Sequence, residues 1–267
     1  MTHYSLRHEY IKDVSSRLLA MCKYLSMSFL VLHMDGVERL SDLVDIPYPQ
    51  HPHCATILVL DTSASMEGNK INELNEGLAI FAAELMMDEL ARKRIEIAIL
   101  SFGEGVRKIC DFTSITEFTP PVLQAGGFTP MGEAILTAIS MIEARKKEYR
   151  EFGIDYYRPW IFLITDGQPT DMRHGDERWN EVITAIHTGE SQQKFLFWAL
   201  GVDQANFAVL RSLSPPGRTP LQLNETHFAD MFVWLSKSLS KISDSVIGEQ
   251  ITLENPVGPE GWGSIPL

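Results

Sequence analysis

Two continuous apolar runs, each followed by an aspartate, constrain the fold of this chain more than any other feature. Residues 55–60 (ATILVL) precede Asp61, and residues 160–165 (WIFLIT) precede Asp166. A strand that is covered on both faces lacks the alternation of polar and apolar residues seen in a half-exposed strand. The two runs therefore predict buried, central strands of a parallel sheet, each ending in a carboxylate.

Strand patterns alternate with helix patterns along the rest of the chain. Apolar residues at steps of three and four, beginning at Ile71 and continuing to Leu85, indicate an amphipathic helix after the first strand. Further strands are expected at 94–102, 106–112, 195–200 and 219–223, and further helices at 131–148, 176–192, 204–213 and 228–246. Such alternation predicts an α/β fold with an open, mostly parallel, doubly wound sheet and helices on both faces. Ligands of such sheets bind beyond the carboxyl ends of the strands, where both aspartates are expected.

Three segments follow from the composition. Residues 1–52 are interpreted as an N-terminal helical extension, with its helix at 5–34, followed by a proline-rich linker. Residues 53–247 carry the strand and helix alternation. Residues 248–267 are rich in glycine and proline and are expected to be extended, with Trp262 docking on the domain or on a partner because a large aromatic ring is costly to leave exposed.

Charge and cysteine content exclude several classes of function. The chain has 23 Lys and Arg against 35 Asp and Glu, a formal charge of −12, which argues against binding nucleic acid or an anionic membrane. Cys22, Cys54 and Cys110 show no CxxC spacing, so disulfides and zinc ribbons are not expected. Free cysteines are typical of a reducing compartment, so a cytoplasmic location is expected. The apolar stretch 18–34 is interrupted by Lys23 and is short for a membrane span, so a soluble amphipathic helix is favoured, with an anchor or export signal as the alternative.

Five oxygen-bearing residues are expected to meet at the carboxyl edge of the sheet. Asp61, Ser63 and Ser65 form a D-x-S-x-S segment, in which alternate side chains of an extended loop point the same way. Thr129 stands in a Gly-Gly-Phe-Thr-Pro segment that glycine is expected to keep pliable, and Asp166 can orient a metal-bound water. Oxygen-only ligands suit a hard divalent cation. Mg²⁺ is the expected ion, and the sequence leaves Mn²⁺ and Ca²⁺ open.

Other interpretations of the sequence compete with a metal site. Ser63 and Ser65 could simply cap the following helix. A serine hydrolase would need a nucleophile elbow and a placed histidine, and neither is evident. His51 and His53 form an H-x-H pair near Cys54, but structural zinc needs four ligands, so they are interpreted as linker residues. A metal-dependent hydrolase, in which the same cation activates water, stays open as the alternative function.

The five residues resemble the metal-ion-dependent adhesion site of von Willebrand factor A domains. In that family the three hydroxyls contact the metal, the two aspartates act directly or through water, and an acidic side chain of a partner completes the shell. Segments 145–149 (RKKEY), 157–167 (YRPWIFLITDG), 169–171 (PTD) and 232–239 (FVWLSKSL) are similar to the bacterial tellurite-resistance (TerY-like) branch. That resemblance implies a cytoplasmic, non-enzymatic interaction module, with a protein kinase or phosphatase as partner in stress response or phage defence. Phe128 departs from the small residue common beside the threonine.

Overall fold

A computed structural model of the chain describes residues 46–203, 205–223, 227–257 and 262–265. Its compact unit of described residues begins at Ile46. The helix expected at 5–34 and most of the linker fall outside these residues. No helix among the residues described is both long and apolar enough to cross a membrane.

The elements follow the predicted order, with strands and helices alternating along most of the chain. The strands are β1 (Cys54–Asp61), β2 (Ile95–Phe102), β3 (Val106–Ser114), β4 (Trp160–Thr165), β5 (Leu196–Val202), β6 (Leu221–Leu223) and β7 (Gly263–Ser264). The helices are η2 (Ala64–Met66, a 3₁₀ turn), α2 (Asn69–Met87), α3 (Glu89–Arg94), α4 (Met131–Glu151), α5 (Glu177–Ser191), α6 (Phe207–Leu213) and α7 (Phe228–Asp244). The short α3, the 3₁₀ turn and β7 were not expected from the sequence.

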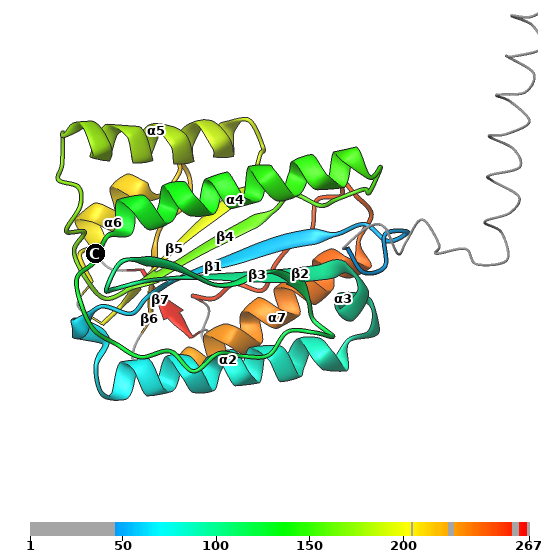
Figure 1. Ribbon diagram of the computed structural model, residues 1–267, viewed down its shortest axis with the longest axis horizontal. Coiled ribbons are helices and arrows are strands. Elements are labelled where there is room, and N and C mark those ends of the chain that lie inside the picture. Colours follow the sequence, from blue (N-terminus) through cyan, green and yellow to red (C-terminus); the bar gives the residue numbers. More distant parts are fainter. Residues whose placement is uncertain (1–45, 204, 224–226, 258–261, 266–267) are drawn as a thin grey trace, which may run out of the picture. The chain divides into compact units, whose positions relative to one another are not determined.

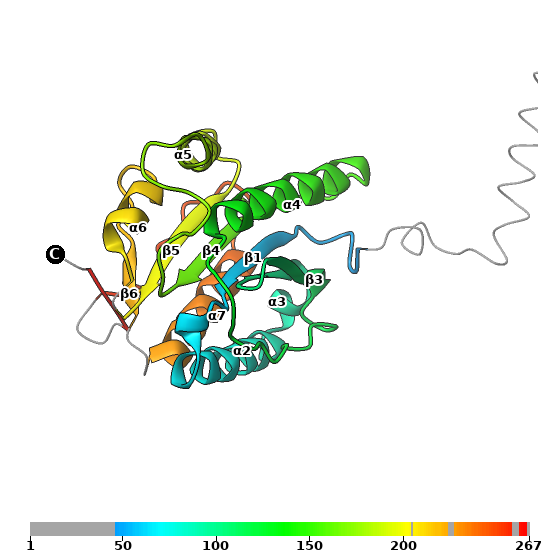
Figure 2. The same cartoon turned by 60° about the vertical axis from the view of Figure 1, so that its left-hand side comes forward.

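The strands form one open sheet in the order β3-β2-β1-β4-β5-β6-β7. Strands β2, β1, β4, β5 and β6 are parallel, whereas β3 and β7 pair antiparallel at the two edges. Helices α4, α5 and α6 cover one face, and α2, α3 and α7 cover the other (Figure 1; Figure 2). The doubly wound α/β prediction is therefore confirmed, and the core lies in the two layers between sheet and helices.

Burial explains why the central strands read as continuous apolar runs. Every residue of β1, β2 and β4 is buried, because each strand has helices on both faces and a neighbouring strand on both sides. The sequence of β2 alternates, with Ile95, Ile97 and Ile99 separated by Glu96 and Ala98. In the structure Glu96 is nonetheless 1% exposed, so the polar position of that strand faces the interior.

The C-terminal segment packs on the domain through Trp262. This ring is 7% exposed and meets Trp234 of α7 edge-on, with ring centroids 5.5 Å apart. Trp234 in turn contacts Trp198 and Phe162 of the sheet. The docking expected for Trp262 is therefore confirmed, and β7 follows directly after it.

We expect Trp262→Ala to lower the free energy of unfolding by about 2 kcal/mol, because it removes the packing of the ring against Trp234. The loss is smaller than for a ring at the centre of a core, because Trp262 lies at the edge of the sheet. Chemical denaturation followed by far-UV circular dichroism measures the loss. Ile265→Ala is the matched control, since that side chain is 50% exposed. Equal stability of the two variants would show that the contact contributes nothing.

Candidate metal centre

The two strand-terminal aspartates lie at the same edge of the sheet. Strands β1 and β4 are parallel neighbours, with Leu60 paired to Ile164, so Asp61, which ends β1, and Asp166, which follows β4, lie at the same edge. Asp61 is fully buried, and the side chain of Asp166 is 1% exposed. Two carboxylates thus face each other at the edge where open α/β sheets bind ligands.

Asp61 is held in a fixed orientation by its neighbours. Its Oδ1 accepts a hydrogen bond from the backbone N–H of Ser63 at 2.8 Å, and its Oδ2 accepts one from the Thr165 hydroxyl at 2.5 Å. Burial raises the pKa of this carboxyl to about 6; the hydrogen bonds from Ser63 and Thr165 oppose that shift, and the charge of Asp166 adds to it. Near neutral pH the charged form of Asp61 is therefore energetically costly in the metal-free fold.

The two serines of the D-x-S-x-S segment connect the aspartates. The hydroxyl oxygens of Ser63 and Ser65 lie 3.0 Å apart, and the Ser65 hydroxyl donates to Asp166 Oδ1 at 2.6 Å. The Ser63 side chain makes no capping hydrogen bond to the 3₁₀ turn that follows it, and α2 begins after Gly68. Helix capping therefore does not explain why serines occupy these two positions. Their hydroxyls instead converge with the Asp166 carboxylate on one point.

Thr129 reaches the same point from the loop before α4. It is 6% exposed, and its backbone exchanges hydrogen bonds with Thr170 of the loop after β4. A Cβ atom added to Gly167 would lie 3.4 Å from the Thr129 hydroxyl and 3.6 Å from Asp61 Oδ2. The glycine thus leaves open a space that is bordered by both side chains.

The glycines before Thr129 fix the loop rather than loosen it, contrary to the sequence interpretation. Gly127 has a φ of +82°, and a Cβ there would lie 2.6 Å from the backbone nitrogen of Glu104. Gly126 donates to the Thr62 carbonyl at 2.8 Å, and Phe128 donates to the Gly103 carbonyl at 3.0 Å. Glycine is needed here because three backbone segments approach closely.

The donor set fits a hard cation. The structure brings together all five predicted residues, which offer two carboxylates and three hydroxyls, and oxygen is the ligand that Mg²⁺ prefers. Within the described part of the chain, no three His, Cys, Asp or Glu side chains gather as a metal cluster. The site therefore depends on hydroxyls, which leave residual positive charge on a bound ion.

Three further residues belong to this site and were missed in the sequence. Thr165 anchors Asp61, as described above. The Lys70 ammonium lies 2.5 Å from Asp166 Oδ2 and 3.7 Å from the Asp203 carboxylate. The only signal for Asp203 was its place directly after a strand, and Lys70 looked like any solvated helix lysine.

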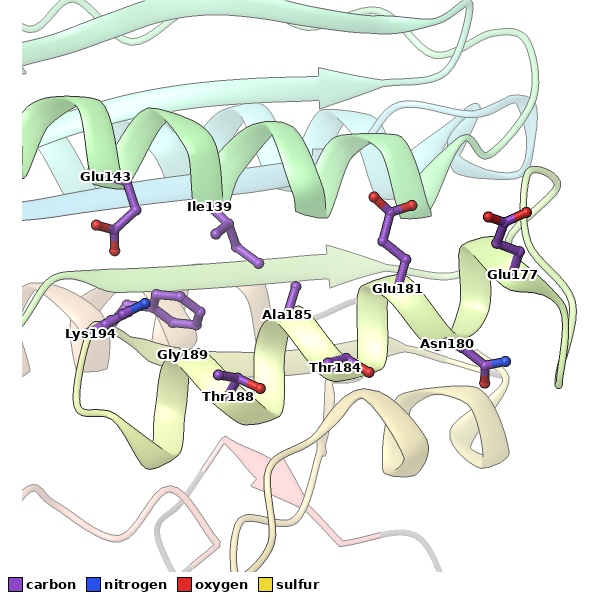
Figure 3. Close-up of a pocket in the computed structure, with 11 residues that line it drawn as sticks. Ile139, Glu143, Glu177, Asn180, Glu181, Thr184, Ala185, Thr188, Gly189 and Lys194 are labelled. Atoms are coloured by element: carbon purple, nitrogen blue, oxygen red, sulfur yellow. The ribbon is translucent and has the colours of Figure 1, made fainter.

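A groove of about 610 Å³ lies elsewhere, between α4 and α5, and Figure 3 shows its lining side chains. Ile139, Ala185 and Phe195 give it an apolar surface, and Glu177 and Glu181 stand along α5. None of the five candidate residues lines this groove, so it is separate from the strand-end site.

His53 does not behave as a linker residue. It is 1% exposed, and its Nδ1 lies 3.1 Å from the Glu96 carboxylate. Glu96 also binds Arg145 and Tyr149 of α4. This cluster lies at the amino end of β2 and therefore at the opposite edge of the sheet from Asp61.

Comparisons with known proteins identify the class of domain. Residues 56–168 match the family model of the von Willebrand factor type A domain. The vWF domain of the type V pili tip protein Mfa5 from Porphyromonas gingivalis is similar, with a TM-score of 0.53 and 11% identity over 76% of this chain and 99% of that chain. The pilus adhesin SpaC from Lactobacillus rhamnosus GG gives a TM-score of 0.54 at 13% identity. That match covers 72% of this chain but only 30% of SpaC. A comparison with curated protein sequences gave no match.

Residues 56–168 therefore match a von Willebrand factor type A domain, and the α/β fold of the described residues agrees with that match. The family match covers the segment from β1 to the residues just after β4, and it includes Asp61, Thr129 and Asp166. At identities of 11–13% the structural neighbours establish the fold alone. This fold is commonly used in protein–protein interaction and adhesion.

Proposed function

We propose that this chain is a non-enzymatic, divalent-metal-dependent protein-interaction module. The observation that carries the proposal is the convergence of two carboxylates and three hydroxyls from three loops at one sheet edge. Asp61, Ser63, Ser65, Thr129 and Asp166 are the residues assigned to the ion, which we take to be Mg²⁺. When bound, the ion would supply a positive charge that attracts an acidic side chain of a partner protein.

The protein's own groups prepare the site for such a contact. Thr165 and the Ser63 backbone hold Asp61, and Ser65 holds Asp166, so both carboxylates already accept hydrogen bonds. These contacts hold both carboxylates at the point where the hydroxyls converge, which supports their assignment to an ion. The domain is strongly acidic, and a bound cation would reverse the sign of the local potential for an acidic partner.

An exposed aromatic ring lies next to the site. Phe128, the neighbour of Thr129, is 76% exposed, where the resemblance leads one to expect a small residue. Aromatic residues are enriched at protein interfaces, where they supply large contact areas. We assign Phe128 to the apolar part of the partner contact, beside the acidic group that reaches the ion.

The partner class rests on the sequence resemblance to the tellurite-resistance branch. On that basis the partner is a protein kinase or phosphatase in a bacterial stress-response or phage-defence system, and the chain acts in the cytoplasm. The acidic charge of −12 suits this assignment better than nucleic acid or an anionic membrane surface.

Thr129→Ala tests the site without disturbing the core. We expect Mn²⁺ and Mg²⁺ affinity, measured by titration calorimetry, to fall about tenfold or more, because one ligand hydroxyl is lost. Circular dichroism and the melting temperature of the metal-free protein should stay near those of the wild type. Partner recovery should fall equally on treatment with EDTA, and the two effects should not add.

Thr137→Ala is the matched control for this test. The Thr137 hydroxyl donates to the Glu133 carbonyl within α4, away from the aspartates. The Thr137→Ala variant should bind metal and partner as the wild type does. Wild-type metal affinity in Thr129→Ala would remove this residue from the site, and partner recovery unaffected by EDTA would refute the metal bridge.

A further inference from the structure

Lys70 places a fixed positive charge at the candidate metal centre. Its Nζ lies 2.5 Å from Asp166 Oδ2 and donates to the Ser65 carbonyl at 3.3 Å. Both acceptors belong to residues assigned to the ion. The ammonium therefore holds the same carboxylate that a divalent ion would need.

The position of Lys70 on its helix points to a role in the site. It is the second residue of α2, and the first turn of that helix carries no acidic side chain. A cation near a helix N-terminus is unfavourable because the helix dipole is positive there. The nearby carboxylates of Asp166 and Asp203 compensate for this placement, at 2.5 Å and 3.7 Å.

The surroundings allow the ammonium to move away. Lys70 is 20% exposed and Asp166 only 1%, so the lysine lies on the solvent side of the carboxylate. A lysine side chain is a flexible four-carbon stem with a compact charge. Asp203, 27% exposed, offers a second carboxylate within reach.

We propose that Lys70 is an internal counter-cation that competes with the divalent ion for Asp166 and so sets the affinity of the site. With Lys70 on Asp166, the carboxylate is neutralised and the site is closed to a second cation. When the ion takes Asp166, Lys70 moves toward Asp203. This inference rests on the proposed metal site and assigns its regulation to a residue outside the five ligands.

The test measures the dissociation constant for Mn²⁺ by calorimetry in Lys70→Met, Lys70→Arg and the wild type. Lys70→Met keeps the length of the side chain and removes its charge, so we expect binding about tenfold tighter than in the wild type. Lys70→Arg keeps the charge and should bind no more tightly than the wild type. Lys93→Met is the matched control, because Lys93 pairs with Glu89 on α3, at the opposite end of the sheet.

Amine labelling gives a second readout that does not depend on the affinity. Acetylation of Lys70 by an N-hydroxysuccinimide ester, followed by mass spectrometry, should increase when saturating Mg²⁺ is added. Labelling of Lys93 should not change.

The outcomes separate the two proposals. Tighter binding in Lys70→Met alone, with Mg²⁺-dependent labelling of Lys70, supports the competition. Equal affinity in all variants overturns the role of Lys70 and leaves the metal site standing. Absence of Mn²⁺ binding in the wild type and in Lys70→Met overturns the metal site itself, and the inference with it.

Discussion

Arg145→Met is expected to lower the free energy of unfolding by about 3–5 kcal/mol, because it leaves a buried carboxylate without its main partner. Arg145 binds Glu96 with two hydrogen bonds of 2.8 Å, through Nε and Nη2. Glu96 is 1% exposed and also accepts a hydrogen bond from the Tyr149 hydroxyl. Methionine fills a similar volume, so the loss reports on charge rather than on an empty space. Denaturant unfolding at pH 7 measures it.

The loss should depend on pH in a defined direction. Burial raises the pKa of Glu96, but the contacts from His53 and Arg145 outweigh burial and bring it to about 2, below the 4.5 of a free glutamate. In the wild type this group stabilises the fold above about pH 4.5, and the contribution is lost as the pH falls from there toward 2. In Arg145→Met burial dominates and Glu96 takes up a proton more readily. The difference between the proteins should therefore be largest near neutral pH and shrink in acid.

Two further variants show whether the charge is the cause. Arg150→Met changes an exposed arginine of the same helix, which donates a hydrogen bond to the Tyr156 hydroxyl. This variant should change the free energy of unfolding little. Adding Glu96→Gln to Arg145→Met removes the unpaired charge and should restore at least about 1 kcal/mol. A double variant as unstable as Arg145→Met alone would contradict this explanation.

The Glu96 cluster also shows the limit of what the sequence could predict about the fold. The strands and helices were visible because burial on both faces produces apolar runs and packing on one face produces helical periodicity. Glu96 alternates with the isoleucines of its strand, a pattern typical of a position that faces solvent. It is buried because Arg145, 49 residues later, supplies two hydrogen bonds. A pairing across that separation leaves no local pattern.

Some residues of the candidate site were likewise predictable from the sequence, and others were not. Asp61 and Asp166 were predictable because a parallel sheet brings the carboxyl ends of its strands to one edge. Thr129 was predicted from its hydroxyl in a glycine-containing loop, and the resemblance to a known family agreed with that prediction. Lys70 and Thr165 were not, because their roles depend on the side-chain geometry around two buried carboxylates. The strand β7 was missed because two residues are too short to show a period.

Asp61→Asn is expected to stabilise the metal-free protein by about 1–3 kcal/mol at pH 7 while abolishing metal binding. Burial raises the pKa of Asp61 to about 6, against the 3.8 of a free aspartate. An acid whose pKa is raised on folding opposes folding above that pKa, and this cost fades as the pH falls from about 6 toward 3.8. Each pKa unit corresponds to about 1.4 kcal/mol, which sets the scale of the gain.

The hydrogen bonds of Asp61 can survive the change to asparagine. Its amide oxygen can still accept from the Ser63 backbone, and its amide nitrogen can donate to the Thr165 hydroxyl oxygen. The neutral side chain is therefore accommodated, but it no longer offers the ion a charge. The wild-type melting temperature should rise on addition of Mn²⁺, because the ion binds only the folded form, whereas that of Asp61→Asn should not.

Asp88→Asn is the matched control, since Asp88 caps α3 through the backbone N–H groups of Leu90 and Ala91, and asparagine caps as well as aspartate does. It should leave both stability and metal response near those of the wild type. The metal-free stability should rise in Asp61→Asn alone, and this variant should lose the Mn²⁺ response. That result would mean that burying the charged Asp61 carboxylate destabilises the fold and that a bound cation offsets this destabilisation. An Asp61→Asn variant less stable than the metal-free wild type would show instead that the charge of Asp61 serves the fold, and the assignment of this residue to the ion would then lose its energetic support.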